Sequence, residues 1–134
     1  MAAKEEIERF IDSEFPQFKS TILKVGNGGA TVLRPIGPDD LRPGGTVSGI
    51  VLAGVADEAL YTALLGEIGI VPLAVTTNLT INFMRKPLAE RAIIGLCKLL
   101  KVGRSLAVGQ VELYSEGMDL PVAHVVGTYS IPPG

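Results

Sequence analysis

The chain has 134 residues, of which 47% are apolar and 19% are charged, with 12 Lys and Arg against 14 Asp and Glu. This length predicts one domain, and the net charge of −2 argues against the clustered cationic surface that nucleic-acid binding needs. Charged residues make up about 25% of an average globular chain. The deficit predicts apolar surface buried against a second copy, so we expect a homo-oligomer, either a dimer or a tetramer.

The scarcity of Cys and His excludes several kinds of site. A single cysteine, Cys97, cannot form an internal disulfide, and a single histidine, His124, cannot form a histidine metal cluster, so we expect no metal site. The apolar runs are shorter than the roughly 18 residues of a membrane span, and the charged N-terminus lacks the apolar core of a signal peptide. We therefore expect a cytoplasmic protein with no membrane or nucleic-acid partner.

The N-terminal segment, residues 1–18, is expected to form an amphipathic helix. Ile7, Phe10 and Ile11 share one face at helical spacing, and a proline near the end of the segment stops the pattern. Residues 20–36 then place two β-rich runs around an Asn-Gly pair, which is typical of a hairpin. A loop rich in Gly, Pro and Asp follows.

Residues 47–66 are the longest segment with helical character, and nearly all of their side chains are apolar or small. A helix that is apolar on every side is normally surrounded by protein. Ser48 is suited to cap its start, and Gly66 or Gly69 to end it. Its small residues are expected to let it lie close to a sheet: Gly49, Ala53, Gly54 and Ala56.

Four strands joined by short turns are expected after this helix: residues 72–86, 91–102, 104–115 and 120–131. In the first of them, strict alternation places Val75 and Thr77 on the buried face and Thr76 on the polar face. The sequence therefore predicts an α+β fold in one domain over residues 1–134. A five- to six-stranded antiparallel sheet is expected to wrap around the long central helix.

Asp57 is the residue of the central helix that most needs explanation, because it is one of two acids among apolar neighbours. A buried carboxylate costs free energy unless it is hydrogen-bonded or functional. Two alternatives stay open: Asp57 or Glu58 faces solvent from a half-exposed helix, or Asp57 performs chemistry. The helix start, at Ser48 and Gly49, also has two interpretations. Its free backbone amides stabilise an oxyanion, or the glycines only form a loop and Ser48 only caps the helix.

Further residues are candidates for contacts with a substrate, although a solvated surface or a place in the core is an alternative for each. Polar residues of the strand after the helix are suited to orienting a water: Thr76, Thr77 and Asn78. Cations at strand ends are suited to binding phosphate: Arg85, Lys86 and Arg104. Apolar side chains near Asp57 are candidates for lining a pocket: Tyr61, Leu65 and Val75.

The order of these motifs resembles the hotdog-fold thioesterase superfamily, and within it the PaaI-like acyl-CoA thioesterases of phenylacetic acid degradation. The resemblance covers about residues 20–131 and rests on the stretches LAGVADEALYTALL, LAVTTNLTINFMRKP, LKVGRSLAVGQVELYSEG and PVAHVVGTYSIPP. It implies a dimer or tetramer with active sites at the subunit boundary. Coenzyme A is then part of the substrate, and no cofactor is implied.

In that family the helix usually opens with His-Gly-Gly, and an acid nine residues after the His is catalytic. Asp57 matches this acid, Gly49 matches the glycine whose amide polarises the thioester carbonyl, and Ser48 stands in place of the His. The resemblance also places the hydroxyl that holds the water at Thr76. It implies contacts to phosphate or pantetheine near Arg104, with Arg85 and Lys86 contributing.

The resemblance implies hydrolysis of a small or medium acyl-CoA, aromatic ones included. Asp57 would act as general base on a water, or as nucleophile through an anhydride. The alternative is a hotdog protein that binds acyl-CoA or another small ligand without turnover, which Ser48 in place of His favours. A hydratase is disfavoured, because the helix carries no His.

Overall fold

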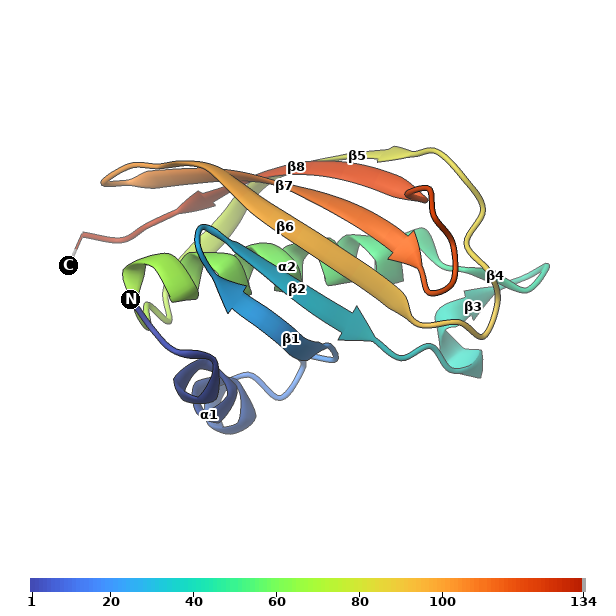
Figure 1. Cartoon of the computed structure of the whole chain (residues 1–134), viewed down its shortest axis with the longest axis horizontal. Coiled ribbons are helices and arrows are strands. Elements are labelled where there is room, and N and C mark those ends of the chain that lie inside the picture. The colour runs from blue at the N-terminus through green and yellow to red at the C-terminus, as the bar shows by residue number, and fades with distance from the viewer. Residues whose placement is uncertain (134) are drawn as a thin grey trace.

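A long central helix and a six-stranded antiparallel sheet form the body of the molecule (Figure 1). The computed structural model describes residues 1–133. The central helix is α2 (Gly49–Ile68), and the strands of the sheet have the order β1-β2-β6-β7-β8-β5. Their bounds are β1 Thr21–Gly26, β2 Gly29–Arg34, β5 Val75–Phe83, β6 Ile93–Val102, β7 Leu106–Ser115 and β8 Ala123–Ser130. The predicted α+β architecture, a sheet around one long helix, is confirmed.

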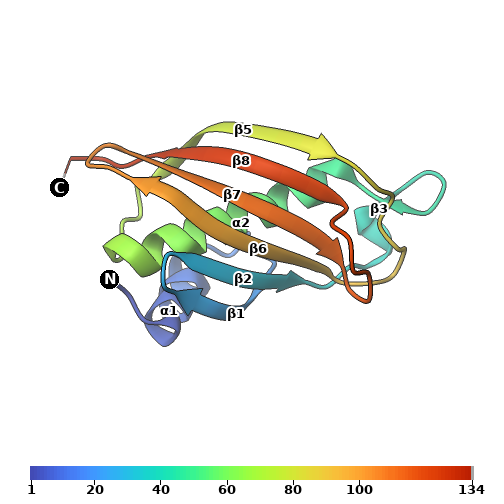
Figure 2. The same ribbon diagram turned by 45° about the horizontal axis from the view of Figure 1, so that its top comes forward.

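The N-terminal helix α1 (Lys4–Glu14) is shorter than the predicted segment 1–18. It ends before Pro16, because the residue that precedes a proline disfavours the helical conformation. Ile7 and Ile11 are buried where α1 packs against α2 and β1. Figure 2 shows α1 at the β1 side of the molecule, across α2 from the edge strand β5.

The bounds of α2 differ by two residues from the predicted 47–66. Ser48 is the N-cap, as expected, and its Oγ accepts a hydrogen bond from the Ile50 amide. Gly69, with φ 98°, ends the helix, whereas Gly66 stays inside it. By length and composition α2 is apolar enough to cross a membrane, but it is the core helix of this fold, and most of it is buried.

The segment before α2 contains more regular structure than the predicted loop. The β1–β2 hairpin turns at Asn27 and Gly28, whose φ angles of 52° and 75° are both positive, as a two-residue turn with Asn-Gly requires. After β2 come a short 3₁₀ turn (Pro38–Asp40) and a ribbon of two short strands, β3 (Leu41–Arg42) and β4 (Thr46–Val47). This ribbon leads directly into Ser48.

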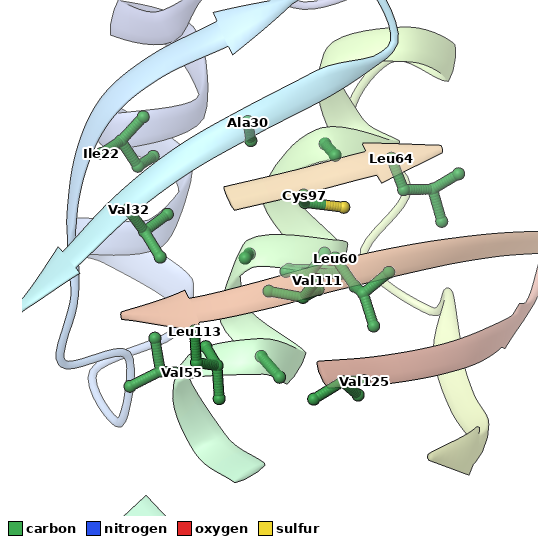
Figure 3. Packing of buried hydrophobic residues seen from close by; sticks show 14 of the residues in the cluster. Ile22, Ala30, Val32, Val55, Leu60, Leu64, Cys97, Val111, Leu113 and Val125 are labelled. Carbon is green, nitrogen blue, oxygen red and sulfur yellow. The ribbon is translucent and has the colours of Figure 1, made fainter. Parts of the chain in front are cut away.

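Glycines of both the sheet and the helix bring α2 close to the strands. On the helix side, a Cβ atom at Gly66 would lie 2.5 Å from a methyl group of Val25 on β1. Gly109 and Gly127 are paired across β7 and β8. A Cβ atom at either would lie 2.6 Å or 2.5 Å from a methyl group of Leu60. In contrast, a Cβ atom at Gly54 would meet nothing within 4 Å. The expectation that Gly54 permits the approach is therefore wrong, whereas Gly49 does face β5, where a Cβ atom would lie 3.4 Å from Phe83. Figure 3 shows Leu60 beneath these strands in the apolar core.

Candidate active site

Asp57 lies on the face of α2 that looks toward the start of β5 and the end of β8. Its Oδ1 accepts hydrogen bonds from Thr76 Oγ1 at 2.5 Å and from Tyr129 Oη at 2.7 Å. Burial, and then the adjacent Asp57 charge, raise the pKa of Tyr129 above its ordinary value, so the phenol stays protonated and donates. Within residues 1–133, no Lys, Arg or His forms an ion pair with Asp57. Two neutral hydroxyls therefore hold the carboxylate.

A cleft of about 500 Å³ opens beside this carboxylate. Its walls come from both helices, the α2–β5 connection and two strands: Phe10, Glu14, Phe15, Asp57, Tyr61, Pro72, Ala74, Val75, Thr76 and Tyr129. Tyr61 and Val75 are among them, as predicted, whereas Leu65 is fully buried in the core and does not line the cleft. The cleft is thus a largely aromatic space with Asp57 and Thr76 at one end and the Glu14 carboxylate in its α1 wall.

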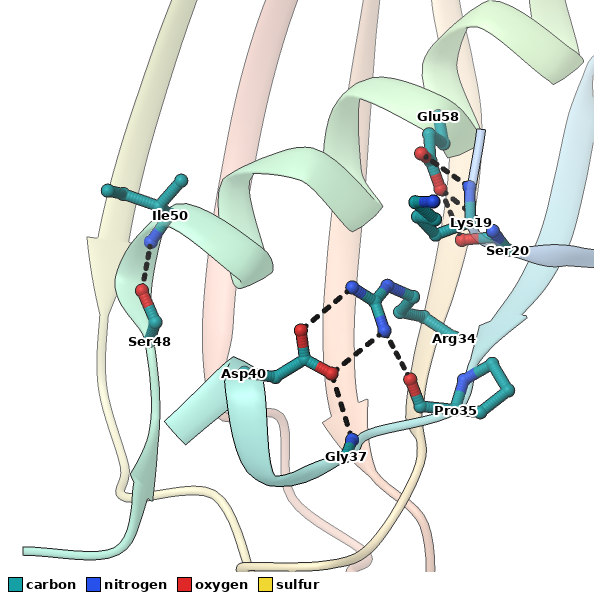
Figure 4. A network of polar contacts seen from close by, with 9 residues as sticks. All are labelled: Lys19, Ser20, Arg34, Pro35, Gly37, Asp40, Ser48, Ile50 and Glu58. Carbon is teal, nitrogen blue, oxygen red and sulfur yellow. Dashed lines mark hydrogen bonds and ion pairs between the residues drawn. The ribbon is translucent and has the colours of Figure 1, made fainter. Parts of the chain in front are cut away.

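Glu58, the second acid of the helix, has a structural role. Its carboxylate accepts hydrogen bonds from the backbone amides of Lys19 and Ser20 at 3.0 Å and 3.1 Å, and also from the Ser20 hydroxyl (Figure 4). It thereby fixes the segment that connects α1 to β1. Of the two acids, the structure ties Glu58 to the fold and places Asp57 in the cleft.

A β-bulge decides which threonine reaches Asp57. The pairing of β5 with β8 shifts by one residue between Thr76 and Asn78, so Thr77 is an extra residue in the ladder. Thr76, opposite Tyr129, consequently shares the helix-facing side with Leu79, which packs against the core. The predicted alternation, with Thr76 on the polar face, is wrong for this reason. Thr77 instead donates to the Thr128 carbonyl at 3.3 Å.

The start of α2 is fixed by a clamp in the preceding loop (Figure 4). Arg34 donates two hydrogen bonds of 3.0 Å to the Asp40 carboxylate, which also accepts from the Gly37 amide at 2.8 Å. The Gly37 amide, and then Arg34, hold the pKa of Asp40 below its ordinary value. The Asp40 carbonyl accepts from the Ser48 amide at 2.9 Å. The clamp therefore sets where the helix begins and where the Gly49 amide lies.

Gly49 and Asp57 do not converge within one chain. They are eight residues apart on α2, which corresponds to about 12 Å along the helix axis. Asp57 lies beside Thr76 at the start of β5, whereas Gly49 lies at the other end, where a Cβ atom would be 3.4 Å from Phe83. One thioester carbonyl cannot contact both groups of the same subunit.

The remaining predicted residues lie outside the cleft. Asn78 is exposed and accepts a hydrogen bond from Thr80. Arg85 donates to the Pro121 carbonyl at 2.8 Å and, with the exposed Lys86, follows the far end of β5. Arg104 lies near the start of β5, in the wall of a second groove of about 560 Å³ that shares Pro72 with the first. The structure thus separates these cations by the length of β5.

Three aromatic residues of the site were not predicted from the sequence: Tyr129, Phe10 and Phe15. Tyr129 shares the buried face of β8 with Val125 and Gly127, and a tyrosine at such a position needs a partner for its hydroxyl. That partner, Asp57, is 72 residues away in the chain. Phe10 and Phe15 enter the cleft from α1, and no local signal connects them to β5. Within residues 1–133, no group of three or more His, Cys, Asp or Glu side chains is placed to hold a metal ion.

Comparisons with known proteins agree on one family. The thioesterase superfamily profile matches residues 44–122. The structure of a proposed thioesterase from Silicibacter sp. TM1040 shares 43% identity over 97% of this chain and 92% of its own, with a TM-score of 0.89. No curated protein matches the chain.

More distant structures show the same fold. The zebra fish thioesterase superfamily member 2 is 20% identical, covers 98% of this chain and 100% of its own, and has a TM-score of 0.85. The E. coli PaaI protein of the phenylacetic acid degradation operon is 20% identical, with 95% and 94% coverage and a TM-score of 0.78. The chain therefore belongs to the thioesterase superfamily and has its hotdog fold.

Proposed function

We propose that the protein hydrolyses the thioester of small or medium acyl-CoA substrates, including aromatic ones, with Asp57 as its catalytic carboxylate. The observation that carries the proposal is the placement of Asp57. Of the acids of the core helix it is the one that lies in the wall of a largely aromatic cleft, where Thr76 and Tyr129 orient it. Membership of the thioesterase superfamily supports the reaction class.

The hydrogen bonds of Asp57 suggest how it acts on a water molecule. Both side-chain donors bind Oδ1, which leaves Oδ2 to accept a proton from water in the cleft. The resulting hydroxide adds to the thioester carbonyl carbon, and an amide N–H stabilises the oxyanion. When the tetrahedral intermediate collapses, the carbon–sulfur bond breaks and the proton on Asp57 passes to the thiolate. Direct attack by Oδ2, through an anhydride that water then hydrolyses, uses the same placement.

A second subunit is part of this proposal, because Gly49 lies about 12 Å from Asp57 in one chain. β5 is an edge strand of the sheet (Figure 2), and most of its residues are exposed. An antiparallel pairing of two β5 edges about a twofold axis brings the start of one strand beside the end of the other. Asp57 of one subunit then meets the Gly49 amide of its partner.

The surface of the single chain supports such a pairing. Its accessible area is 7301 Å², against about 6,700 Å² expected for a folded monomer of this mass. Apolar side chains are exposed at both ends of the β5 edge, among them Ile50 at 85%, Phe83 at 57% and Val75 at 54%. An exposed apolar edge strand favours association with another strand.

The same pairing gathers the cations that would bind coenzyme A. Arg104 lies at the start of β5, and Arg85 and Lys86 follow its end, so the twofold axis brings Arg104 toward Arg85 and Lys86 of the partner subunit. Arg and Lys side chains form charge-assisted hydrogen bonds to phosphates. We expect these three cations to bind the nucleotide end of the substrate, outside the aromatic cleft.

The test is Asp57→Asn, assayed by thiol release from acyl-CoAs of different acyl groups. Asparagine keeps an oxygen that accepts from Thr76 and Tyr129, so the variant is expected to fold, while hydrolysis falls about a hundredfold or more. Asp119→Asn, at an exposed loop position, is the matched control. An Asp57→Asn protein that hydrolyses as fast as wild type would contradict the proposal. Binding of acyl-CoA to wild type without thiol release would instead support the alternative, a non-catalytic binding protein.

A further inference from the structure

Helix α1 forms one wall of the cleft that opens beside Asp57. It contributes Phe10 and Glu14, and Phe15 follows directly after its last residue. Figure 2 shows α1 at the β1 side of α2. Its residues line the cleft together with Val75 and Thr76 of β5. Whatever occupies the space beside the Asp57 carboxylate therefore contacts α1 on its other side.

The aromatic side chains of α1 continue an aromatic surface that begins next to Asp57. The ring of Tyr61 stacks on that of Tyr129 at a centroid distance of 6.0 Å. Tyr61 also contacts Phe15 edge-on, with a ring-centroid distance of 5.8 Å, and Phe10, with a ring-centroid distance of 6.4 Å. Tyr61 is only 5% exposed, so this surface is held firmly. It offers an acyl group an apolar wall from the carboxylate to α1.

The charge of the cleft is negative and unbalanced. Its ten lining residues include two carboxylates, Asp57 and Glu14, and no Lys, Arg or His. Glu14 is the last residue of α1, where the helix dipole favours a cation rather than an acid. No ion pair among residues 1–133 involves Glu14. The stability of α1 therefore does not explain why an acid stands at this position.

We propose that α1 makes the cleft selective for uncharged acyl groups. Phe10 and Phe15 pack against the acyl chain, and Glu14 repels an acyl group that ends in a carboxylate. The inference rests on the proposed function, because it takes this cleft as the acyl site. An acyl group with a terminal carboxylate would lie near two negative charges with no counter-charge in the wall, whereas a neutral acyl group of the same length carries no charge for them to repel.

The experiment compares two substrates of equal chain length, hexanoyl-CoA and adipoyl-CoA, which differ by the terminal carboxylate. For wild type we expect kcat/KM to favour hexanoyl-CoA by about tenfold or more, and high salt to reduce this preference. Glu14→Gln is expected to lower the preference about threefold, and Glu14→Lys to lower it further. Glu6→Gln, the same change at an exposed position of α1 outside the cleft, should leave the ratio unchanged.

Equal kcat/KM for the two substrates in wild type would overturn the inference while leaving thioester hydrolysis intact. A strong preference that Glu14→Lys does not alter would also overturn it, since the discrimination would then be steric. Calorimetric binding to Asp57→Asn gives a readout without turnover. If wild type releases no thiol, yet the Kd ratio of the two esters shows the same dependence on Glu14, the proposed function fails and the selectivity of the cleft stands.

Discussion

Ile50→Glu tests the subunit pairing. Ile50 is at the start of α2, and most of its side chain is exposed in the single chain. Ile50 is 85% exposed and lies next to Gly49, near Phe83 at the end of the β5 edge. Within one chain the change is expected to be harmless, because an acid in the first turn of a helix is favourable by about 0.3–1 kcal/mol. Only a structure that buries this side chain against a partner should be damaged.

The size of the effect follows from burial and symmetry. Transfer of a fully exposed isoleucine into an interface is worth about 1.5–3 kcal/mol, and a twofold axis buries two copies. Loss of both contacts weakens the dimer by about 3–6 kcal/mol, which raises its Kd by roughly two to four orders of magnitude. The two buried acids add desolvation to this loss.

Light scattering and thiol release on the same samples measure the outcome. We expect wild type to have the mass of two or more chains, and Ile50→Glu to approach the 14.1 kDa of one chain and to lose hydrolysis with the partner. Leu23→Glu is the matched control: Leu23 is 48% exposed on β1, at the opposite edge of the sheet. An Ile50→Glu protein that stays dimeric and active, or a wild-type monomer that hydrolyses acyl-CoA, would contradict the proposed subunit pairing.

Three further predictions concern the site and the fold. Thr76→Val removes the hydroxyl that orients Asp57 and should lower kcat about tenfold with little change in KM. Thr77→Val, at the bulge, should leave kcat unchanged. Equal effects of the two variants on kcat would argue against the bulge. Leu60→Ala should lower the free energy of unfolding by about 2–5 kcal/mol in a urea titration, because the methyl groups that fill the space at the paired sheet glycines are lost. The lowered pKa of Asp40 means that its interactions stabilise the fold above about pH 4, the ordinary pKa of an aspartate, and are lost as the pH falls through the lower folded value. Asp40→Asn should therefore destabilise the protein at pH 7, and its difference from wild type should shrink in acid; a constant difference would contradict the assignment.

The local sequence pattern was sufficient to predict the two helices and the six strands of the main sheet, and to single out Asp57. The apolar run of α2, its cap at Ser48 and the Asn-Gly hairpin all depend on residues close in sequence. An acid in that run stands out for the same reason. What the pattern left open was which of two adjacent acids is tied to the fold. The answer depends on the amides of Lys19 and Ser20, far from Glu58 in the chain.

Features that depend on pairing between distant segments were not predictable from local sequence. The bulge at Thr77 exists only relative to β8, so alternation along β5 placed Thr76 on the wrong face. The contact of Leu60 with Gly127 likewise joins α2 to the last strand. The aromatic wall of the cleft depends on where α1 packs. The sequence of α1 predicts which of its residues are buried, but not which part of the molecule they contact. Each of these is a tertiary contact that overrides a local period.

The central claim is that each site combines Asp57 of one subunit with the Gly49 amide of the other. Gly49→Pro deletes that amide at the first helical position, where proline is well tolerated, and Ser48 has the extended ψ of 140° that a following proline requires. Gly49→Ala keeps the amide and controls for the contact with Phe83. The Asp57→Asn and Gly49→Pro proteins should each be inactive alone, while Gly49→Ala retains hydrolysis.

The most direct measurement is the thiol-release rate of a mixed dimer, purified through two different tags, that pairs an Asp57→Asn subunit with a Gly49→Pro subunit. If the site is shared, one of the two sites in this dimer has both an intact Asp57 and an intact Gly49. We then expect about half of the wild-type rate per dimer. A mixed dimer as inactive as its two parents would contradict a shared site, because both groups would then have to come from the same chain.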